Sequence, residues 1–201
     1  MRYAQQTPWQ HIFATLGFLV LAGLVASPHA LADEVLFDGK NLDKWKILNC
    51  KAEIQDGAIL LRAGNGLVQS KRQYTDYVLD FEWKALKTDQ WDSGLYFRYA
   101  HVPEGKPWPK RYQVNLRQGM EGDLVGFPKA VVKAPIDAHR WNHFRLTVRG
   151  TTATLEVNGK TAWRVDGLKT LRGYIALQAE VPHGGQFLFR NIHIRELTAT
   201  K

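Results

Sequence analysis

Apolar and polar side chains alternate along most of this chain, and this period of two limits the possible folds more than any other feature. The candidate strands are 77–84, 95–100, 112–117, 144–148, 152–157, 161–165, 174–179 and 186–197. Asn158-Gly159 separates two of them and is a strong signal for a tight hairpin turn. After residue 33 no segment keeps a helical period of 3.6 with caps. The pattern therefore predicts an all-β, two-sheet antiparallel jelly-roll sandwich.

The two ends of this region carry matching strand-like segments, Val35–Trp45 and Phe189–Leu197. In the first, Asp38-Gly39 is a turn pair, because Asp tolerates and Gly favours positive φ. Trp45 follows as a large apolar anchor. We expect the two ends to lie side by side in one sheet.

Residues 1–32 have the pattern of a secretory signal peptide. Arg2 lies in a short polar segment, residues 12–25 are almost wholly apolar, and Ala30-Leu31-Ala32 is a small-x-small cleavage signal. The alternative is an uncleaved anchor, but the apolar run is shorter than the ~20 residues that span a bilayer. We expect cleavage after Ala32, one domain over 33–201, and an exported, periplasmic or extracellular bacterial protein with no membrane contact after cleavage.

Composition argues against two kinds of protein, a disulfide-stabilised domain and a nucleic-acid-binding protein. Cys50 is the only cysteine, so no intramolecular disulfide stabilises the domain and its core must do so. The net charge is +8, but the basic residues are scattered among acidic ones instead of forming a block. Without a basic patch, nucleic acid is not the expected partner.

In a sandwich each strand turns one face away from the core, and on several strands this face carries groups that suit a sugar. These predicted groove residues are Asp80, Glu82, Arg98, Gln113, Asn115 and Gln178. Amides, carboxylates and guanidinium groups bond sugar hydroxyls in pairs. An ordinary solvated sheet face is the alternative. Trp91 flanks the Asp92-Ser93-Gly94 turn, and Trp108, in a Pro-rich insertion over 101–110, is predicted to stack on a sugar ring or, alternatively, to pack on its own strand.

Five motifs resemble the 3-keto-disaccharide hydrolase domain family over nearly all of the chain after residue 33. They are Phe81-Glu82-Trp83, Asp92-Ser93-Gly94 followed by Arg98, Ile175–Gln178, a following His183, and Arg190-Asn191-Ile192. The resemblance implies a concanavalin A-like sandwich. One difference is that the family's Tyr-Glu-x-Gln is Tyr112-Gln113-Val114-Asn115 here.

The resemblance also implies a reaction, glycoside cleavage of 3-keto-glycosides by removal of the C2 proton, elimination and hydration. We predict His183 as the base, Arg98 as the oxyanion partner, and Glu82 paired with Arg98 across neighbouring strands. His183 as a simple hairpin residue is the alternative. Gln113, Asn115, Gln178, Trp91, Trp108 and Tyr96 are the predicted substrate-binding residues, and an oligosaccharide or keto-sugar glycoside is the expected partner.

Other functions remain as alternatives or are excluded. Asp80 and Glu82 lie about 7 Å apart on one strand and point in parallel, so they do not flank a glycosidic bond as a classical pair does. His spacing argues against zinc, while an oxygen-ligand calcium site near Asp89 and Asp92 stays open as a divalent-cation alternative. A non-catalytic carbohydrate-binding module is the main alternative. A protein-interaction domain is favoured only if the Trp108 insertion fills the groove.

Overall fold

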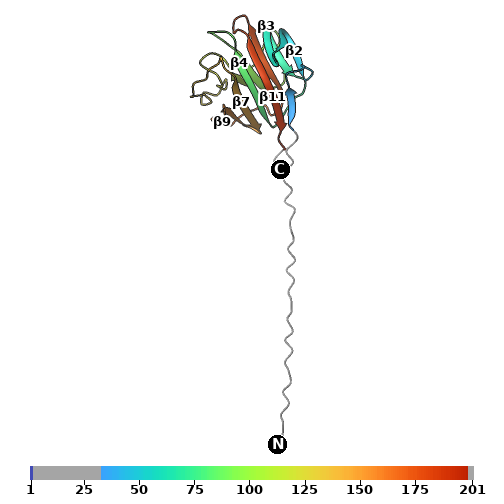
Figure 1. Ribbon diagram of the computed structural model, residues 1–201, viewed down its shortest axis with the longest axis vertical. Coiled ribbons are helices and arrows are strands. Elements are labelled where there is room, and N and C mark those ends of the chain that lie inside the picture. The colour runs from blue at the N-terminus through green and yellow to red at the C-terminus, as the bar shows by residue number, and fades with distance from the viewer. Residues whose placement is uncertain (2–32, 199–201) are drawn as a thin grey trace.

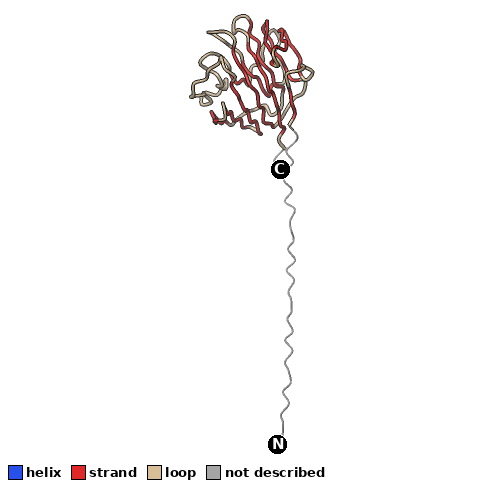
Figure 2. Tube along the Cα trace, viewed as in Figure 1, coloured by secondary structure: helices blue, strands red, loops and turns tan. Residues whose placement is uncertain are grey.

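The computed structural model describes Met1 and residues 33–198 of the 201-residue chain. The predicted signal peptide over 1–32 therefore lies, except for Met1, outside the described residues. Residues 33–198 form strands and loops (Figure 2), and this part of the chain contains no helix of the length and apolarity that a membrane span requires. The strands are β1 (Glu34–Phe37), β2 (Trp45–Gln55), β3 (Ala58–Ser70), β4 (Tyr77–Ala85), β5 (Gly94–Tyr99), β6 (Gln113–Asn115), β7 (Asn142–Arg149), β8 (Thr152–Val157), β9 (Lys160–Val165), β10 (Tyr174–Val181) and β11 (Phe187–Glu196).

All strands pair antiparallel in the order β6-β5-β10-β3-β11-β4-β7-β8-β9, with β1 added to β11 and β2 to β3. β1 and β11 come from the two ends of the domain and lie side by side (Figure 1), with Val35 opposite His193. Trp45 is buried and donates its indole N–H to the Leu36 carbonyl at 2.8 Å. The prediction that the two ends share a sheet is confirmed.

β3 joins two layers of the fold. Its first part pairs with β11 through Ile59 and Leu60, and its second part, 64–69, pairs with β10. Gly64 begins the second part with φ of +88°, a conformation that glycine adopts without steric cost. We call β6, β5, β10 and the second part of β3 the front layer, and β11, β4, β7, β8 and β9 with β1 the back layer. The all-β jelly-roll prediction is confirmed, with the difference that β3 makes the two layers one curled sheet.

The core lies between the layers. Phe81 and Trp83 of β4 and Phe144 of β7 face Phe97 of β5 and Leu177 of β10, and all five are fully buried. The Trp83 and Phe144 rings meet edge to face with centroids 5.6 Å apart. Each such side chain contributes roughly 1.5–3 kcal/mol by leaving water. The inward faces are thus used for stability, and the outward faces of the two layers remain for function.

Candidate functional site

A chain of polar side chains crosses the outer face of the front layer. Gln113 on β6 donates its amide N–H to Oε1 of Gln178 on β10 at 2.6 Å, and Gln178 donates to Oε2 of Glu180 at 3.1 Å. β5 lies between β6 and β10, and Gly94 makes the crossing possible. A Cβ at Gly94 would lie 2.2 Å from Nε2 of Gln113. The absence of a side chain at one position therefore lets two amides meet over a strand.

Two carboxyl groups stand beside this amide chain. Burial raises the pKa of Glu180, the Asp92 charge raises it further, and His183 and Arg117 act in the opposite direction. Burial also raises the pKa of Asp92, against the attraction of Arg117, whose Nε is 3.8 Å from Oδ2 of Asp92. Both carboxyl groups consequently hold a proton more readily than ordinary carboxyls do. We call Asp92, Tyr96, Gln113, Arg117, Gln178 and Glu180 the front-face site.

Backbone contacts hold the two carboxyl groups near each other. Asp92 donates its N–H to the Gly184 carbonyl at 2.9 Å, and Gly184 donates to the Glu180 carbonyl at 2.6 Å. Ser93 donates its hydroxyl to the Gln178 carbonyl at 2.6 Å. His183 is exposed in the same turn, and its carbonyl accepts a hydrogen bond from Lys87 at 2.7 Å. The turn thus places His183 at the rim of the front-face site.

Aromatic side chains line the site on its other side. Tyr96 and Tyr99 are buried on the outer face of the front layer, with ring centroids 6.3 Å apart. Trp108 is half-buried against this cluster and donates its indole N–H to the Ala179 carbonyl at 3.3 Å. The insertion over 101–110 therefore packs onto the front layer through Trp108, which bonds to β10.

Arg98 is not part of this site, which corrects its predicted position. Its side chain is fully buried and donates to the backbone carbonyls of Thr75 and Gly150 and to the Asp76 carboxylate at 2.7 Å. Arg98 has φ of +50° beside an irregularity in the β10–β5 pairing, so the alternation that placed it on the outer face is interrupted there. Arg98 anchors the interior and does not face solvent.

Glu82 also lies elsewhere, on the outer face of the back layer. It accepts hydrogen bonds from Arg190 at 2.7 Å and Asn191 at 2.9 Å, so the predicted Glu82–Arg98 pair is wrong. Burial alone would raise the pKa of Glu82, but the hydrogen bonds from Asn191 and Arg190 together lower it below its ordinary value. β3 and β11 separate β4 from β10, so Glu82 and Gln178 do not meet in one groove. The predicted trio of His183, Glu82 and Arg98 does not come together.

Two predicted substrate-binding residues, Trp91 and Asn115, form hydrogen bonds with the loop that follows β6. Trp91 is buried in the main core and donates to Oε1 of Glu121 at 2.9 Å. Asn115 is buried, and its Oδ1 accepts the backbone N–H of Arg117 at 3.1 Å. Both side chains are therefore engaged in holding the loop in place.

Sequence reasoning missed Glu180 as a functional group and named Asp92 only as a calcium ligand. The signal for Glu180 was present, because the period of two puts it on the same strand face as Gln178. For the calcium alternative, residues 33–198 contain no group of three or more His, Cys, Asp or Glu side chains arranged to hold a metal ion.

Residues 32–195 match the family described as 3-keto-alpha-glucoside-1,2-lyase-like domain. The chain belongs to this family. The resemblance inferred from the five motifs is thereby confirmed for the domain as a whole. A search of curated proteins finds no match to this sequence.

Solved structures related to this lyase-like domain share its fold at low sequence identity. A candidate glycosyl hydrolase from Parabacteroides distasonis is 21% identical with a TM-score of 0.64, over 83% of this chain and 100% of that one. The carbohydrate-binding module CBM66 from Bacillus subtilis is 14% identical (TM-score 0.59; 76% and 96% covered). The Bacillus licheniformis β-glucanase is 14% identical (TM-score 0.59; 84% and 99% covered). At these identities the likeness establishes the concanavalin A-like fold alone.

Proposed function

We propose that this lyase-like domain cleaves 3-keto-glucosides at the front-face site. The observation that carries the proposal is the pair Glu180 and Asp92, two carboxyl groups with raised pKa beside the Gln113–Gln178 amide chain. A base for this reaction works best when its pKa approaches the operating pH. Family membership supports the substrate class, and the geometry supports which side chains would act.

The 3-keto group makes the C2–H bond acidic, and each proposed step follows from that. Glu180 takes the C2 proton, the C2 electron pair forms the C1=C2 double bond of an enone, and the C1–O bond breaks. Asp92 in its protonated form gives its proton to the departing oxygen. Water then adds across the double bond to give the 3-keto sugar. Gln113 and Arg117 offer N–H donors to the negative oxygen that develops at C3.

The aromatic groups and His183 have supporting roles in this proposal. Tyr96 and the half-buried Trp108 give the sugar ring an apolar surface, and rings of this kind suit the C–H face of a pyranose. His183 at the rim assists the exchange of protons with solvent. Its removal should therefore slow the reaction less than removal of Glu180.

Release of nitrophenol from a 4-nitrophenyl 3-keto-glucoside tests the proposal. Glu180→Gln should lower the rate at least a hundredfold, since a positioned base contributes roughly 10²–10⁴-fold. Glu53→Gln is the matched control, because Glu53 is an exposed carboxylate on β2 paired with Arg62 at 3.3 Å. Equal rates for the Glu180→Gln and Glu53→Gln proteins would reject Glu180 as the base.

A non-catalytic carbohydrate-binding module is the second candidate. The amide of Gln113 stands where the resembled family has a carboxylate, which favours binding over catalysis. CBM66 shares the fold and is named as a binding module. Saturable binding of the keto-sugar, with nitrophenol release no faster than in buffer, would establish this reading and reject cleavage.

We also propose that the protein is exported and cleaved after Ala32. The leader over 1–32 supports it, and N-terminal sequencing of the protein recovered from a bacterial periplasm should find Asp33 as the first residue. An intact Met1 or Arg2 terminus would contradict cleavage after Ala32.

A further inference from the structure

A hollow of about 540 Å³ opens on the outer face of the back layer, away from the front-face site. It lies across β11, β4 and β7, which run side by side in Figure 1. We call it the back-face hollow, and its lining residues are Asp33, Val78, Asp80, Glu82, His143, Arg145, Asn191, His193, Ile194 and Arg195. None of these residues takes part in the reaction proposed above, so the hollow needs a separate explanation.

The strand register places oppositely charged groups in rows across the hollow. Asp80 lies between His193 on β11 and Arg145 on β7. Its Oδ1 accepts hydrogen bonds from both Nε2 of His143, at 2.9 Å, and Nε of Arg145, at 2.8 Å. Glu82 is likewise held by Arg190 and Asn191. The protein itself therefore neutralises two of the three lining carboxylates, and the third, Asp33, lies 3.9 Å from Nε of Arg195.

The two terminal nitrogens of the Arg145 and Arg195 guanidinium groups, called the fork here, are available to a ligand. Arg145 contacts Asp80 through Nε, and Arg195 approaches Asp33 through Nε at 3.9 Å. Within residues 33–198, neither arginine donates a hydrogen bond through its two terminal nitrogens to another side chain or to a backbone carbonyl. These forks match the two oxygens of a carboxylate. Because the Nε of Arg145 is already hydrogen-bonded to Asp80, the Arg145 fork is oriented before a ligand arrives.

The hollow also offers groups that recognise hydroxyls. Oδ2 of Asp80 accepts no hydrogen bond from residues 33–198, so it is available to a ligand hydroxyl. Val78 supplies an apolar surface among the polar groups. Asn191 has φ of +51° at a bulge between Arg190 and His193. Asparagine adopts this conformation more readily than most residues, and the bulge brings the Asn191 side chain to Glu82.

We propose that the back-face hollow binds a saccharide that carries a carboxylate, such as a hexuronate. The carboxylate pairs with the forks of Arg145 and Arg195, and ring hydroxyls bond to Oδ2 of Asp80. The net charge of +8 attracts anionic saccharides toward the protein in general. The site lies on the opposite layer from Glu180, so it is independent of the proposed cleavage.

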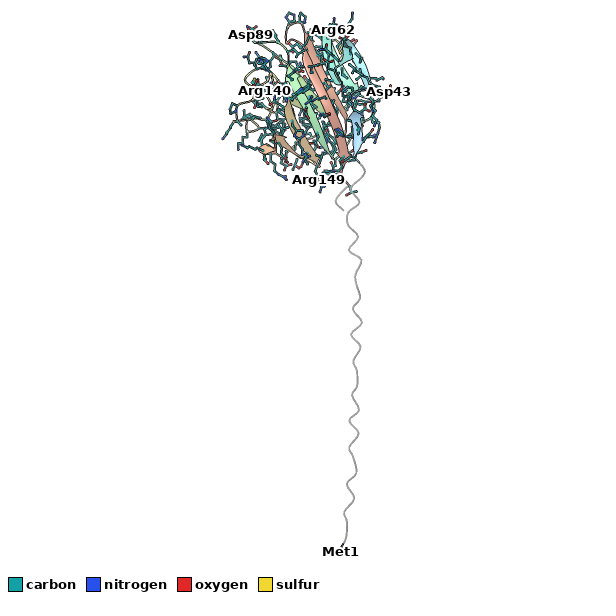
Figure 3. All side chains as sticks on the ribbon, viewed as in Figure 1. Met1, Asp43, Arg62, Asp89, Arg140 and Arg149 are labelled. Atoms are coloured by element: carbon teal, nitrogen blue, oxygen red, sulfur yellow. The ribbon has the colours of Figure 1, made fainter. Side chains whose placement is uncertain are left out.

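An NMR titration of the full protein with D-glucuronate tests this site. Glucuronate should shift the backbone amides of β4, β7 and β11 saturably, while D-glucose at the same concentration should not. Arg145→Gln should weaken glucuronate binding at least tenfold. Arg62→Gln is the matched control, because Arg62 forms a similar exposed pair with Glu53 and lies at the opposite end of the molecule from Arg149, the last residue of β7 (Figure 3). Its affinity should equal that of the wild type.

Several results would overturn the proposal. These are the absence of saturable shifts, equal binding of glucose, and an equal loss of affinity in the Arg62→Gln protein. Inorganic phosphate forms a further arm, because a site that binds phosphate as tightly as glucuronate recognises anions and not a saccharide. If the Arg145→Gln protein does not fold, Arg195→Gln replaces it, with the same tenfold loss expected, because Arg195 is the second proposed partner of the carboxylate and its side chain is exposed.

Discussion

Arg98 shows how a single buried charge can organise the interior of this fold. Its guanidinium donates to the carbonyls of Thr75 and Gly150 and pairs with Asp76, which also accepts the N–H of Gly150 at 3.0 Å. Burial lowers the pKa of Arg98, while the neighbouring Tyr77 and Asp76 act against this shift. Arg98 therefore connects three separate segments of the chain through charged hydrogen bonds.

Replacing Arg98 with Met should destabilise the protein by about 3–5 kcal/mol, because Asp76 and two carbonyls lose their buried partner. Urea unfolding at neutral pH measures this loss. Arg62→Met is the control and should cost no more than about 1 kcal/mol, since its ion pair is exposed. Similar midpoints for the Arg98→Met and Arg62→Met proteins would contradict the anchoring role.

Glu180 gives a prediction about pH. Its raised pKa means that the folded state binds this proton more tightly than the unfolded state. Its contribution to stability is therefore present below the ordinary glutamate pKa and is lost as the pH rises through the folded value. Glu180→Gln, which cannot titrate, should melt close to the wild type near pH 4 and above it at pH 8. If the Glu180→Gln protein melts below the wild type at pH 8, the predicted direction of the Glu180 effect on stability is wrong.

At the scale of elements, β5 matters because Gly94 has no side chain where the Gln113 side chain crosses the strand. Gly94→Ala should push the Gln113 side chain aside and break its 2.6 Å bond to Gln178. The cost in stability should be about 1 kcal/mol, the worth of one hydrogen bond, while substrate binding should fall at least tenfold.

A double-mutant cycle checks this prediction. Gln113→Ala removes the same amide bond, so Gly94→Ala and Gln113→Ala together should weaken keto-sugar binding no more than Gln113→Ala alone. Additive losses would mean that Gly94 acts on the site by another route.

Most of the strands could be predicted from the sequence, because the alternation of apolar and polar residues is visible within each segment alone. The Asn158-Gly159 turn has φ of +50° and +80°, as the two-residue hairpin requires. β2 and β3 were missed, since register shifts between Leu48 and Cys50 and between Lys51 and Ala52 interrupt their alternation. Asp56-Gly57, with φ of +49° and +72°, was the turn signal that could have revealed them.

The candidate site was only partly predictable. Alternation correctly placed Gln113, Gln178 and Tyr96 on one outer face, but it does not say which layer a strand joins. Glu82 was grouped with them because strand order depends on contacts between distant segments. Arg98 was misplaced because its left-handed conformation breaks the alternation at one residue, and nothing in the neighbouring sequence signals it.

At the scale of the whole molecule, the two layers should behave as one cooperative unit. β3 carries hydrogen bonds to β10 in the front layer and to β11 in the back layer. One hydrophobic cluster contains inward residues of both layers, and with Cys50 as the only cysteine no intramolecular disulfide holds either layer separately. The separate clusters on the outer faces are small, with four buried residues in the front layer and three along β3 and β11, so most of the buried apolar side chains belong to the shared core.

Unfolding should therefore be two-state, with one transition for every probe. Tryptophan fluorescence reports on both layers together, through Trp83 and Trp163 in the back layer and Trp108 on the front layer, and far-UV circular dichroism reports on the whole sheet. Backbone amide exchange of β10, against that of β4, compares the layers directly. The urea midpoints should coincide, and the most protected amides of β10 and β4 should exchange with the same free energy. Earlier opening of β10 would mean that the front layer unfolds alone, and that the bend at Gly64 separates two units instead of joining them.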